Sequence, residues 1–163
     1  MIKILIYVVP SGIKFTSDNS VFTVVGNYGR AAAADLNFVV FLKRDRIVLC
    51  SVNTCYAAAK LANTIKGTLC GHIRWIRLNG IGYKVKAFAK LLELSLGLSH
   101  KLVFNLPQNV ESTVIKNNKL KLKSVSLDAV TTVASALSAK KKPDAYRAKG
   151  ILARGVCSSK HND

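Results

Sequence analysis

Residues 119–143, KLKLKSVSLDAVTTVASALSAKKKP, predict one strand followed by one helix. Leucine and lysine alternate over residues 119–123, so an extended chain there has one apolar and one cationic face. From residue 126 to residue 139 the period changes to that of an amphipathic helix. The apolar positions of that helix are Leu127, Val130, Val133, Ala134 and Leu137. We expect Ser124 or Ser126 to cap it and Pro143 to end it.

The same two signals recur upstream. Runs of β-branched or alternating apolar residues predict strands at residues 21–25, 38–42, 47–49, 81–87, 92–96 and 102–104. A helical period predicts a helix over residues 55–70, ended at Gly67 or Gly71. Its apolar face consists of Ala58, Leu61, Ala62, Ile65 and Leu69. The Gly80-Ile81-Gly82 segment is expected to allow a bend or a close backbone approach.

The order of these elements indicates a duplication. Pro10 and Pro107 each precede a run that passes through a turn into a strand, ending at Gly26 and Lys123, and a helix follows in each half. We therefore predict an α+β fold with two similar units, residues 1–72 and 73–163. Each unit is expected to be a small, mostly antiparallel β-sheet packed on one α-helix. An extended basic C-terminal tail is expected to follow the second helix.

The net charge favours a polyanionic partner. The chain has 163 residues and a formal charge of +17. Residues 1–73 contain 8 basic and 3 acidic residues, whereas residues 74–163 contain 17 and 5. Such a charge repels itself in a compact fold and attracts nucleic acid first, an anionic membrane surface second. Any polyanion should therefore bind mainly to the C-terminal half.

Residues 140–154 concentrate this charge. Six cations lie there, namely Lys140, Lys141, Lys142, Arg147, Lys149 and Arg154. Pro143 and two glycines disfavour a helix, so we expect an extended chain whose backbone and side chains are free to contact phosphates. Tyr146 could stack on a base or ribose, or could anchor the segment against the domain. The charged strands are the other candidate surface, but we favour a solvated face for Lys84, Lys86, Lys121 and Lys123.

Catalysis, metal binding and membrane insertion are disfavoured. The eight carboxylates are scattered singly, no nucleophile or phosphate-loop motif occurs, and we expect neither an enzyme, a cofactor nor a small-molecule substrate. The four cysteines form no C-x-x-C pair, so a metal site and a disulfide framework are not expected. Residues 4–9, ILIYVV, are too short to span a membrane and lack a cleavage-like tail of a secretory signal.

Several motifs resemble those of a known family. Residues 94–100, LSLGLSH, followed by Leu106-Pro107 and by residues 141–151, KKPDAYRAKGI, are similar to ribosomal protein six of the large ribosomal subunit, bacterial type. Residues 9–13, VPSGI, and 25–29, VGNYG, resemble the first-domain pattern of that family. The resemblance is collinear over nearly the whole chain, and the C-terminal motif is the most specific part. Departures occur in the leader, MIKILIYVV, at Ala148, and over residues 30–54.

This resemblance implies a two-domain protein that binds large-subunit ribosomal RNA (rRNA) through its second domain and tail. The expected binding residues are Ser99, His100, Lys101, Lys140, Lys141, Lys142, Tyr146, Arg147, Lys149 and Arg154. The expected place is the base of the stalk, near the RNA loop that engages translational GTPases, with neighbouring ribosomal proteins as partners. The drift in composition resembles mitochondrial versions, so we expect a mitochondrial ribosome, with a plastid or bacterial cytoplasmic ribosome as the alternative.

Two other functions remain open from the residues themselves. One is a free-standing basic RNA-binding module or RNA chaperone outside the ribosome. The other is a protein bound to a membrane surface, which would need a basic amphipathic helix. The two predicted helices carry few cations or carry them at one end only, so no membrane partner is expected.

Overall fold

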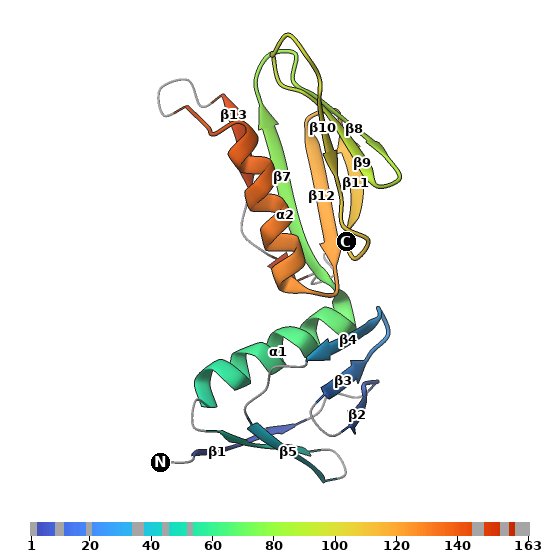
Figure 1. Ribbon diagram of the computed structural model, residues 1–163, viewed down its shortest axis with the longest axis vertical. Helices are drawn as coiled ribbons and strands as arrows, with labels where there is room; N and C mark the ends of the chain where they lie inside the picture. Colours follow the sequence, from blue (N-terminus) through green and yellow to red (C-terminus); the bar gives the residue numbers. More distant parts are fainter. Residues whose placement is uncertain are drawn as a thin grey trace. The chain divides into compact units, whose positions relative to one another are not determined.

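The chain is divided into two compact units, Met1–Gly71 and His72–Asp163, one residue before the predicted boundary. The computed structural model describes residues 3–8, 12–18, 21–33, 38–43, 46–51, 54–144, 149–153 and 157–158 (Figure 1). Each helix follows a run of six strands, as in an α+β fold, and the strand pairs are antiparallel throughout the described residues. The predicted fold class is confirmed.

The first unit contains two three-stranded sheets and the helix α1 (Thr54–Cys70). One sheet has the order β1 (Lys3–Val8), β6 (Arg46–Ser51), β5 (Phe38–Lys43). The other has the order β2 (Lys14–Asp18), β3 (Val21–Val25), β4 (Arg30–Ala33). The helix contacts strands of both sheets and buries Leu61 and Ile65, two residues of its predicted apolar face. It runs through Gly67 and ends before Gly71, which has a φ of 74°.

The second unit also contains two sheets and one helix, α2 (Leu127–Lys140). A three-stranded sheet has the order β10 (Leu102–Asn105), β9 (Leu91–Ser95), β8 (Lys84–Phe88). A five-stranded sheet has the order β11 (Glu111–Lys116), β12 (Lys119–Ser124), β7 (His72–Asn79), β13 (Gly150–Ala153). Its fifth strand, β14 (Cys157–Ser158), also pairs with β7. Pairing on both edges makes β7 the central strand of this sheet.

The two units have the same topology. Sheet orders β1-β6-β5 and β2-β3-β4 in the first unit correspond to β7-β12-β11 and β8-β9-β10 in the second, each element six strands later. The duplication is therefore real, but the predicted match between Pro10 and Pro107 is wrong. Pro107 lies before β11, which corresponds to β5, whereas Pro10 lies before β2. Among the described residues, β13 and β14 have no counterpart in the first unit.

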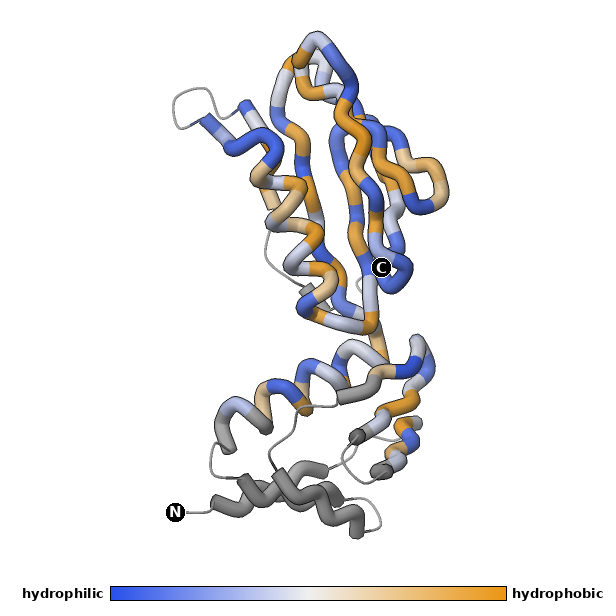
Figure 2. Tube along the Cα trace, viewed as in Figure 1, coloured by the Kyte–Doolittle hydropathy of each residue, from blue (hydrophilic) through white to orange (hydrophobic). Residues whose placement is uncertain are grey.

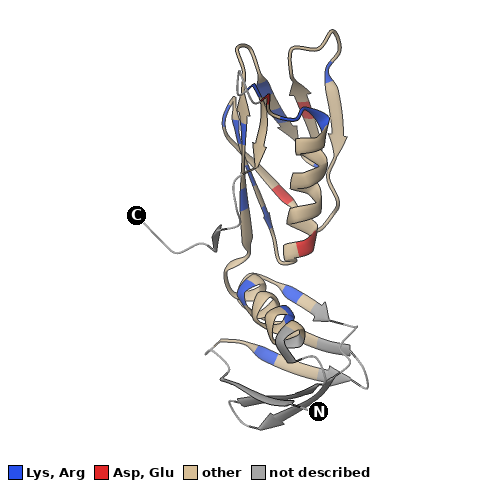
Figure 3. Cartoon of the chain, turned by 90° about the vertical axis from the view of Figure 1, so that its left-hand side faces the viewer, with Lys and Arg blue, Asp and Glu red and all other residues tan. Residues whose placement is uncertain are grey.

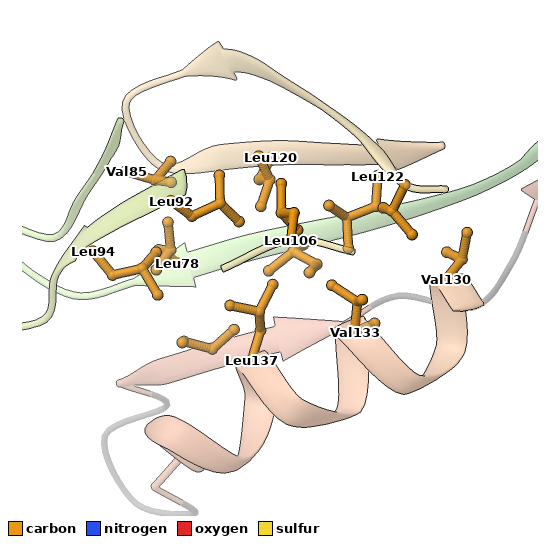
Figure 4. Close-up of a cluster of buried hydrophobic side chains, with 14 of the residues drawn as sticks. Leu78, Val85, Leu92, Leu94, Leu106, Leu120, Leu122, Val130, Val133 and Leu137 are labelled. Carbon is orange, nitrogen blue, oxygen red and sulfur yellow. The ribbon is translucent and has the colours of Figure 1, made fainter. Parts of the chain in front are cut away.

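The core of the second unit lies between α2 and the inner faces of its sheets (Figure 4). Val130, Val133, Ala134 and Leu137 of the helix are buried against leucines of both sheets. On β12 the buried residues are Leu120 and Leu122, and lysines alternate with them, as the KLKLK pattern predicted. Figure 2 shows the same alternation as orange and blue segments along the strands. Burial of apolar area on this scale is the main force that holds the unit together.

The predicted ends of α2 are confirmed. Ser126 is the N-cap, and its side-chain oxygen accepts a hydrogen bond from the Ala129 backbone N–H at 3.4 Å. Ser124 has another role, because its hydroxyl donates to the Asn109 carbonyl and accepts from the Ser126 N–H. Asp128 in the first turn and Lys140 in the last complement the helix dipole. The helix ends at Lys140, shortly before Pro143.

One strand prediction was wrong at its start, and the central strand of the second unit was not predicted. The strand predicted at residues 81–87 begins only at Lys84, because Gly80 to Gly82 form a turn in which Ile81 is 92% exposed. The central strand β7 was not predicted, since its sequence HIRWIRLN does not separate polar from apolar positions cleanly. Arginine occurs on both faces of the strand, at Arg74 and Arg77. Trp75 lies on the face opposite the buried Ile76 and Leu78.

We expect Leu137→Asp to destabilise the second unit by about 3–5 kcal/mol, because it places an unpaired charge at a side chain that is 1% exposed. Ser135→Asp, on the exposed side of the same helix, should cost less than about 1 kcal/mol. Leu127→Asp should also be mild, since Leu127 is half-buried and lies at the helix N-terminus. Urea unfolding followed by the fluorescence of Trp75, the single tryptophan, measures all three. Equal losses for Leu137→Asp and Ser135→Asp would contradict this packing.

Candidate nucleic-acid interface

One end of the second unit gathers three loops (Figure 1). The first is the turn after β7, residues 80–83, and the second joins β9 to β10, residues 96–101. A Cβ built on Gly97 would lie 3.3 Å from the Tyr83 ring, so these two loops are in contact. The third follows α2 and returns to the sheet at Gly150, whose register partner is Asn79, the last residue of β7. Residues far apart in the sequence thus come together at this end.

The base of the third loop is fixed by backbone hydrogen bonds. The Ile151 N–H donates to the Lys141 carbonyl at 3.0 Å, and the Asp144 N–H donates to the Lys149 carbonyl at 3.0 Å. Gly150–Ala153 then pairs with β7 as β13. The segment is extended in β13, as predicted, but the prediction that its backbone is free is wrong at these positions. The reason is that Ile151, 1% exposed, joins the hydrophobic core and holds the segment against the sheet.

Gly150 is required by the close approach of the two sides of this loop. A Cβ there would lie 2.5 Å from the Pro143 Cα and 2.7 Å from the Lys142 carbonyl oxygen. Its φ of 151° is also unfavourable for other residues. In the first loop, a Cβ on Gly80 would overlap the Tyr83 ring at 2.7 Å. The predicted bend is present as the turn at residues 80–82, and the close neighbour of Gly80 is a side-chain ring.

Of the six cations in residues 140–154, four belong to the described part of the chain and lie around the third loop. Lys140, Lys142 and Lys149 are exposed, and Lys141 is half-buried. Figure 3 shows Lys and Arg at the C-terminal end of α2 and along the strands of this unit. Tyr146, Arg147 and Arg154, also predicted to bind RNA, lie outside the described residues. A cluster of ammonium groups on a hydrogen-bonded base can neutralise phosphates at little cost in ordering.

The second loop carries the other predicted binding residues. Ser99, His100 and Lys101 are all exposed. The Lys101 Nζ lies 2.6 Å from the Glu93 Oε1, so this lysine is paired within the protein. The hydrogen bond from Lys101 lowers the pKa of Glu93, partial burial raises it, and the charges of Lys101 and Lys86 lower it further; the net direction is downward. Lys101 can approach a phosphate only in competition with this carboxylate.

Sequence reasoning missed the first loop as part of this end. Ile81 is 92% exposed and Leu98 of the second loop is 42% exposed, beside the half-buried Tyr83. The signal was present in the glycines that flank Ile81, which mark a turn rather than a strand. These apolar tips add surface that can pack on ribose or base edges next to the lysines.

No group of three or more His, Cys, Asp or Glu side chains that could hold a metal occurs among the described residues. Of the helices in the described part of the chain, none is long and apolar enough to cross a membrane.

We expect Gly150→Ala to loosen the base of the third loop. Strain at positive φ should cost about 1–2 kcal/mol, and the overlap with Pro143 and Lys142 a further ~1–3 kcal/mol. Gly82→Ala is the matched control, because Gly82 has a φ of 77° but open space around its Cβ position. It should show the strain alone. Urea unfolding measures both variants, and equal losses would show that the loop is not closely packed at Gly150.

A second prediction concerns the Lys101–Glu93 pair. Lys101→Met should raise the pKa of Glu93 toward its ordinary value of 4.5, as followed by an NMR pH titration of the carboxyl. Because folding lowers the pKa of Glu93, the pair stabilises the folded protein at pH values above the ordinary pKa of a glutamate. This contribution is lost as the pH falls through the lowered pKa of Glu93 in the folded protein. The difference in stability between wild type and variant should therefore narrow in acid. Lys86→Met, which removes a more distant charge, should move the pKa less; an equal shift would contradict the pairing.

Comparison with known proteins identifies the family. No family model matches the chain. The chain is similar to the large ribosomal subunit protein uL6 of Shewanella piezotolerans, with 30% identity over 154 residues that cover 88% of this chain and 86% of that protein. It is 28% identical to uL6 of Rhodospirillum rubrum over 156 residues, 90% of this chain and 88% of that protein. With uL6 of Bdellovibrio bacteriovorus the identity is 34% over 97 residues, 60% of this chain and 54% of that protein. The chain, with its duplicated sheet-and-helix units, belongs to the family of large ribosomal subunit protein uL6.

Proposed function

We propose that this protein is a structural constituent of the large ribosomal subunit that binds and stabilises large-subunit rRNA. Its relatives are named as proteins of that subunit. The observation that carries the proposal is the basic end of the second unit, where Lys140, Lys141, Lys142 and Lys149 lie on a hydrogen-bonded loop base. Contacts of this kind position a protein on phosphates without reading base sequence.

The shape of this end supports rRNA as the ligand. A-form RNA presents phosphates and 2′-hydroxyls, so it is recognised mainly by shape. Three loops at one end of a rigid sheet can follow such a surface, with lysines toward phosphates and polar tips such as Ser99 and His100 toward hydroxyls. Tyr146, Arg147 and Arg154 are assigned to the same contact on the family resemblance of the tail. The role is binding and not catalysis, and it needs no cofactor.

We assign the protein to the stalk base, near the RNA loop that engages translational GTPases. This finer statement rests on the C-terminal motif KKPDAYRAKGI and on the family to which the chain belongs. The first unit would then lie closer to neighbouring ribosomal proteins than to RNA. Its lower charge supports this division, since it holds 8 of the 25 basic residues. A mitochondrial ribosome is the proposed location, on the drift of composition from bacterial relatives.

Sedimentation tests the ribosomal assignment. The tagged protein is expressed in its source, lysates are made gently, and gradients are run at low and then at high magnesium and salt. We expect recovery with the large subunit, persisting in high salt. Recovery in light fractions at every salt concentration would contradict a ribosomal role and favour a free-standing RNA-binding module. The organelle fraction that contains the tagged subunits decides between mitochondrial and other ribosomes.

A charge variant tests the binding surface. Replacing Lys141, Lys142 and Lys149 by Ala should weaken association with large-subunit rRNA and flatten its salt dependence by roughly one unit of slope per lost phosphate contact. The control removes the same charge from the first unit, by Lys14→Ala, Arg30→Ala and Lys66→Ala, three exposed positions. An unchanged slope in the first variant, or an equal change in the control, would overturn the assignment of this end to phosphates.

A further inference from the structure

The outer face of the five-stranded sheet in the second unit is also basic, and the loop contacts do not explain it. Along β12 the leucines point into the core, so Lys119, Lys121 and Lys123 lie on the opposite face. On β7 the buried Ile76 and Leu78 leave Arg77 and Trp75 on that same outer face. From the sequence alone, a solvated surface was the preferred interpretation of the lysines on this strand. The register between strands changes that interpretation.

One row of this face consists of cations directly opposite one another. Lys116 of β11 pairs with Lys119 of β12, and Lys119 pairs with Arg77 of β7. All three side chains are exposed. Directly opposed residues have Cβ atoms about 4.5–5.5 Å apart, and like charges at that spacing are destabilising. The row ends on β13 at Leu152, the register partner of Arg77, so it contains no carboxylate.

The next row supplies an aromatic ring. Lys121 pairs with Trp75, and its Nζ lies 5.7 Å from the centre of the Trp75 ring. Trp75 is half-buried and does not belong to the core cluster of this unit. An indole on the outer face of a sheet beside cations is the arrangement on which unpaired bases stack. The only carboxylate placed on this face by the described strand register is Glu111, opposite Lys123 in the row beyond.

This face continues from the basic loop end. Arg77 lies two residues before Asn79, and Asn79 is the register partner of Gly150, which follows Lys149. A polyanion bound at the third loop therefore meets Arg77 and Lys119 next along the sheet. The two basic regions form one path over the second unit.

We propose that the outer face of the five-stranded sheet binds an unpaired, single-stranded segment of RNA. The phosphates lie on Lys116, Lys119 and Arg77, and one base stacks on Trp75 while Lys121 turns from the ring to a phosphate. The identity of the polyanion rests on the proposed function. A duplex does not satisfy this site, because its bases are already stacked and cannot lie on the indole.

Binding of short RNA to the full chain tests the proposal. The probes are a single-stranded oligoadenylate and an RNA duplex of the same length, and the signal is quenching of Trp75 fluorescence. We expect the single strand to bind and quench, and the duplex to quench little. Equal quenching and affinity for the duplex would overturn the stacking contact. Equal binding to vesicles that contain an anionic phospholipid would overturn the assignment to RNA.

Variants separate the two contacts. Changing Lys116, Lys119 and Arg77 to Ala should flatten the salt dependence of single-strand binding by about two units of slope, at ~0.7 per phosphate. Trp75→Leu should lower the affinity about tenfold or more and leave the slope unchanged; its binding is followed with a labelled RNA. Circular dichroism establishes that each variant is folded. The control is the variant of the first unit with Lys14, Arg30 and Lys66 changed to Ala. If the sheet-face variants lose no more affinity for single-stranded RNA than this control, the proposal is overturned.

Comparison of the loop variant with the sheet-face variant distinguishes this proposal from the proposed function. If the Lys141, Lys142 and Lys149 variant keeps its rRNA affinity while the sheet-face variant loses it, the loop assignment fails and the sheet face stands. The reverse result overturns the sheet face alone.

A stability measurement tests the repulsive row without RNA. Lys119→Gln should raise the urea midpoint of the free protein, and the gain should shrink as salt screens the charges. Lys123→Gln is the control on the same strand and face, because Lys123 lies opposite Glu111. It should lower the midpoint or leave it unchanged. A lower midpoint for Lys119→Gln at low salt would show that the row is not repulsive, and the argument for a polyanion on it would fail.

Discussion

The pairing of β13 with β7 is the constraint on which the functional end depends. Four residues, Gly150–Ala153, form this strand, and Ile151 within it is buried in the core. Without that pairing, the chain after α2 would leave the domain at Pro143 with its cations unconstrained. With it, the hydrogen bonds between Lys141 and Ile151 and between Asp144 and Lys149 close a loop at a fixed place. Fixing the cations before binding would reduce the entropy lost in the proposed contact with phosphates.

The duplication explains why only one unit is built this way. Among the described residues, the two units share a topology of six strands and one helix, so this topology does not by itself specify a basic end. In the described residues, the added strands β13 and β14 occur only in the second unit, where they pair with one edge of β7. The equivalent strand of the first unit, β1, has no strand on the corresponding edge of the described sheet. An unpaired edge is a liability for aggregation, and covering it also brings the basic segment back to the sheet. One addition thus gives both protection of an edge and placement of the basic loop.

The sequence predicted the elements with clean periodicity and missed those without it. The KLKLK strand, the helix of Val130, Val133 and Leu137, and its Ser126 cap could be predicted because burial and pattern agree there. β7 was missed because its outer face holds Trp75 and Ile73, so apolar residues occur on both faces. β13 was missed because a four-residue strand beside glycine has little signal of its own. Its pairing depends on β7, more than seventy residues earlier, and such a long-range contact cannot be seen in local periodicity.

In the candidate site, too, local sequence predicted charges that are adjacent along the chain but not charges that strand pairing brings together. Local sequence identified a cationic segment at Lys140 to Lys142 and Lys149, because the charges there are adjacent along the chain. It held no sign that Lys116, Lys119 and Arg77 are abreast, since only the register of three strands brings them together. Like charges so arranged weaken the free sheet, and the core beneath them must offset that cost. The fully buried leucines Leu120 and Leu122, on the opposite face of the same strand, supply the apolar burial that does so. The core therefore keeps this strand in place in the free protein, and a polyanion on the outer face would remove the remaining repulsion.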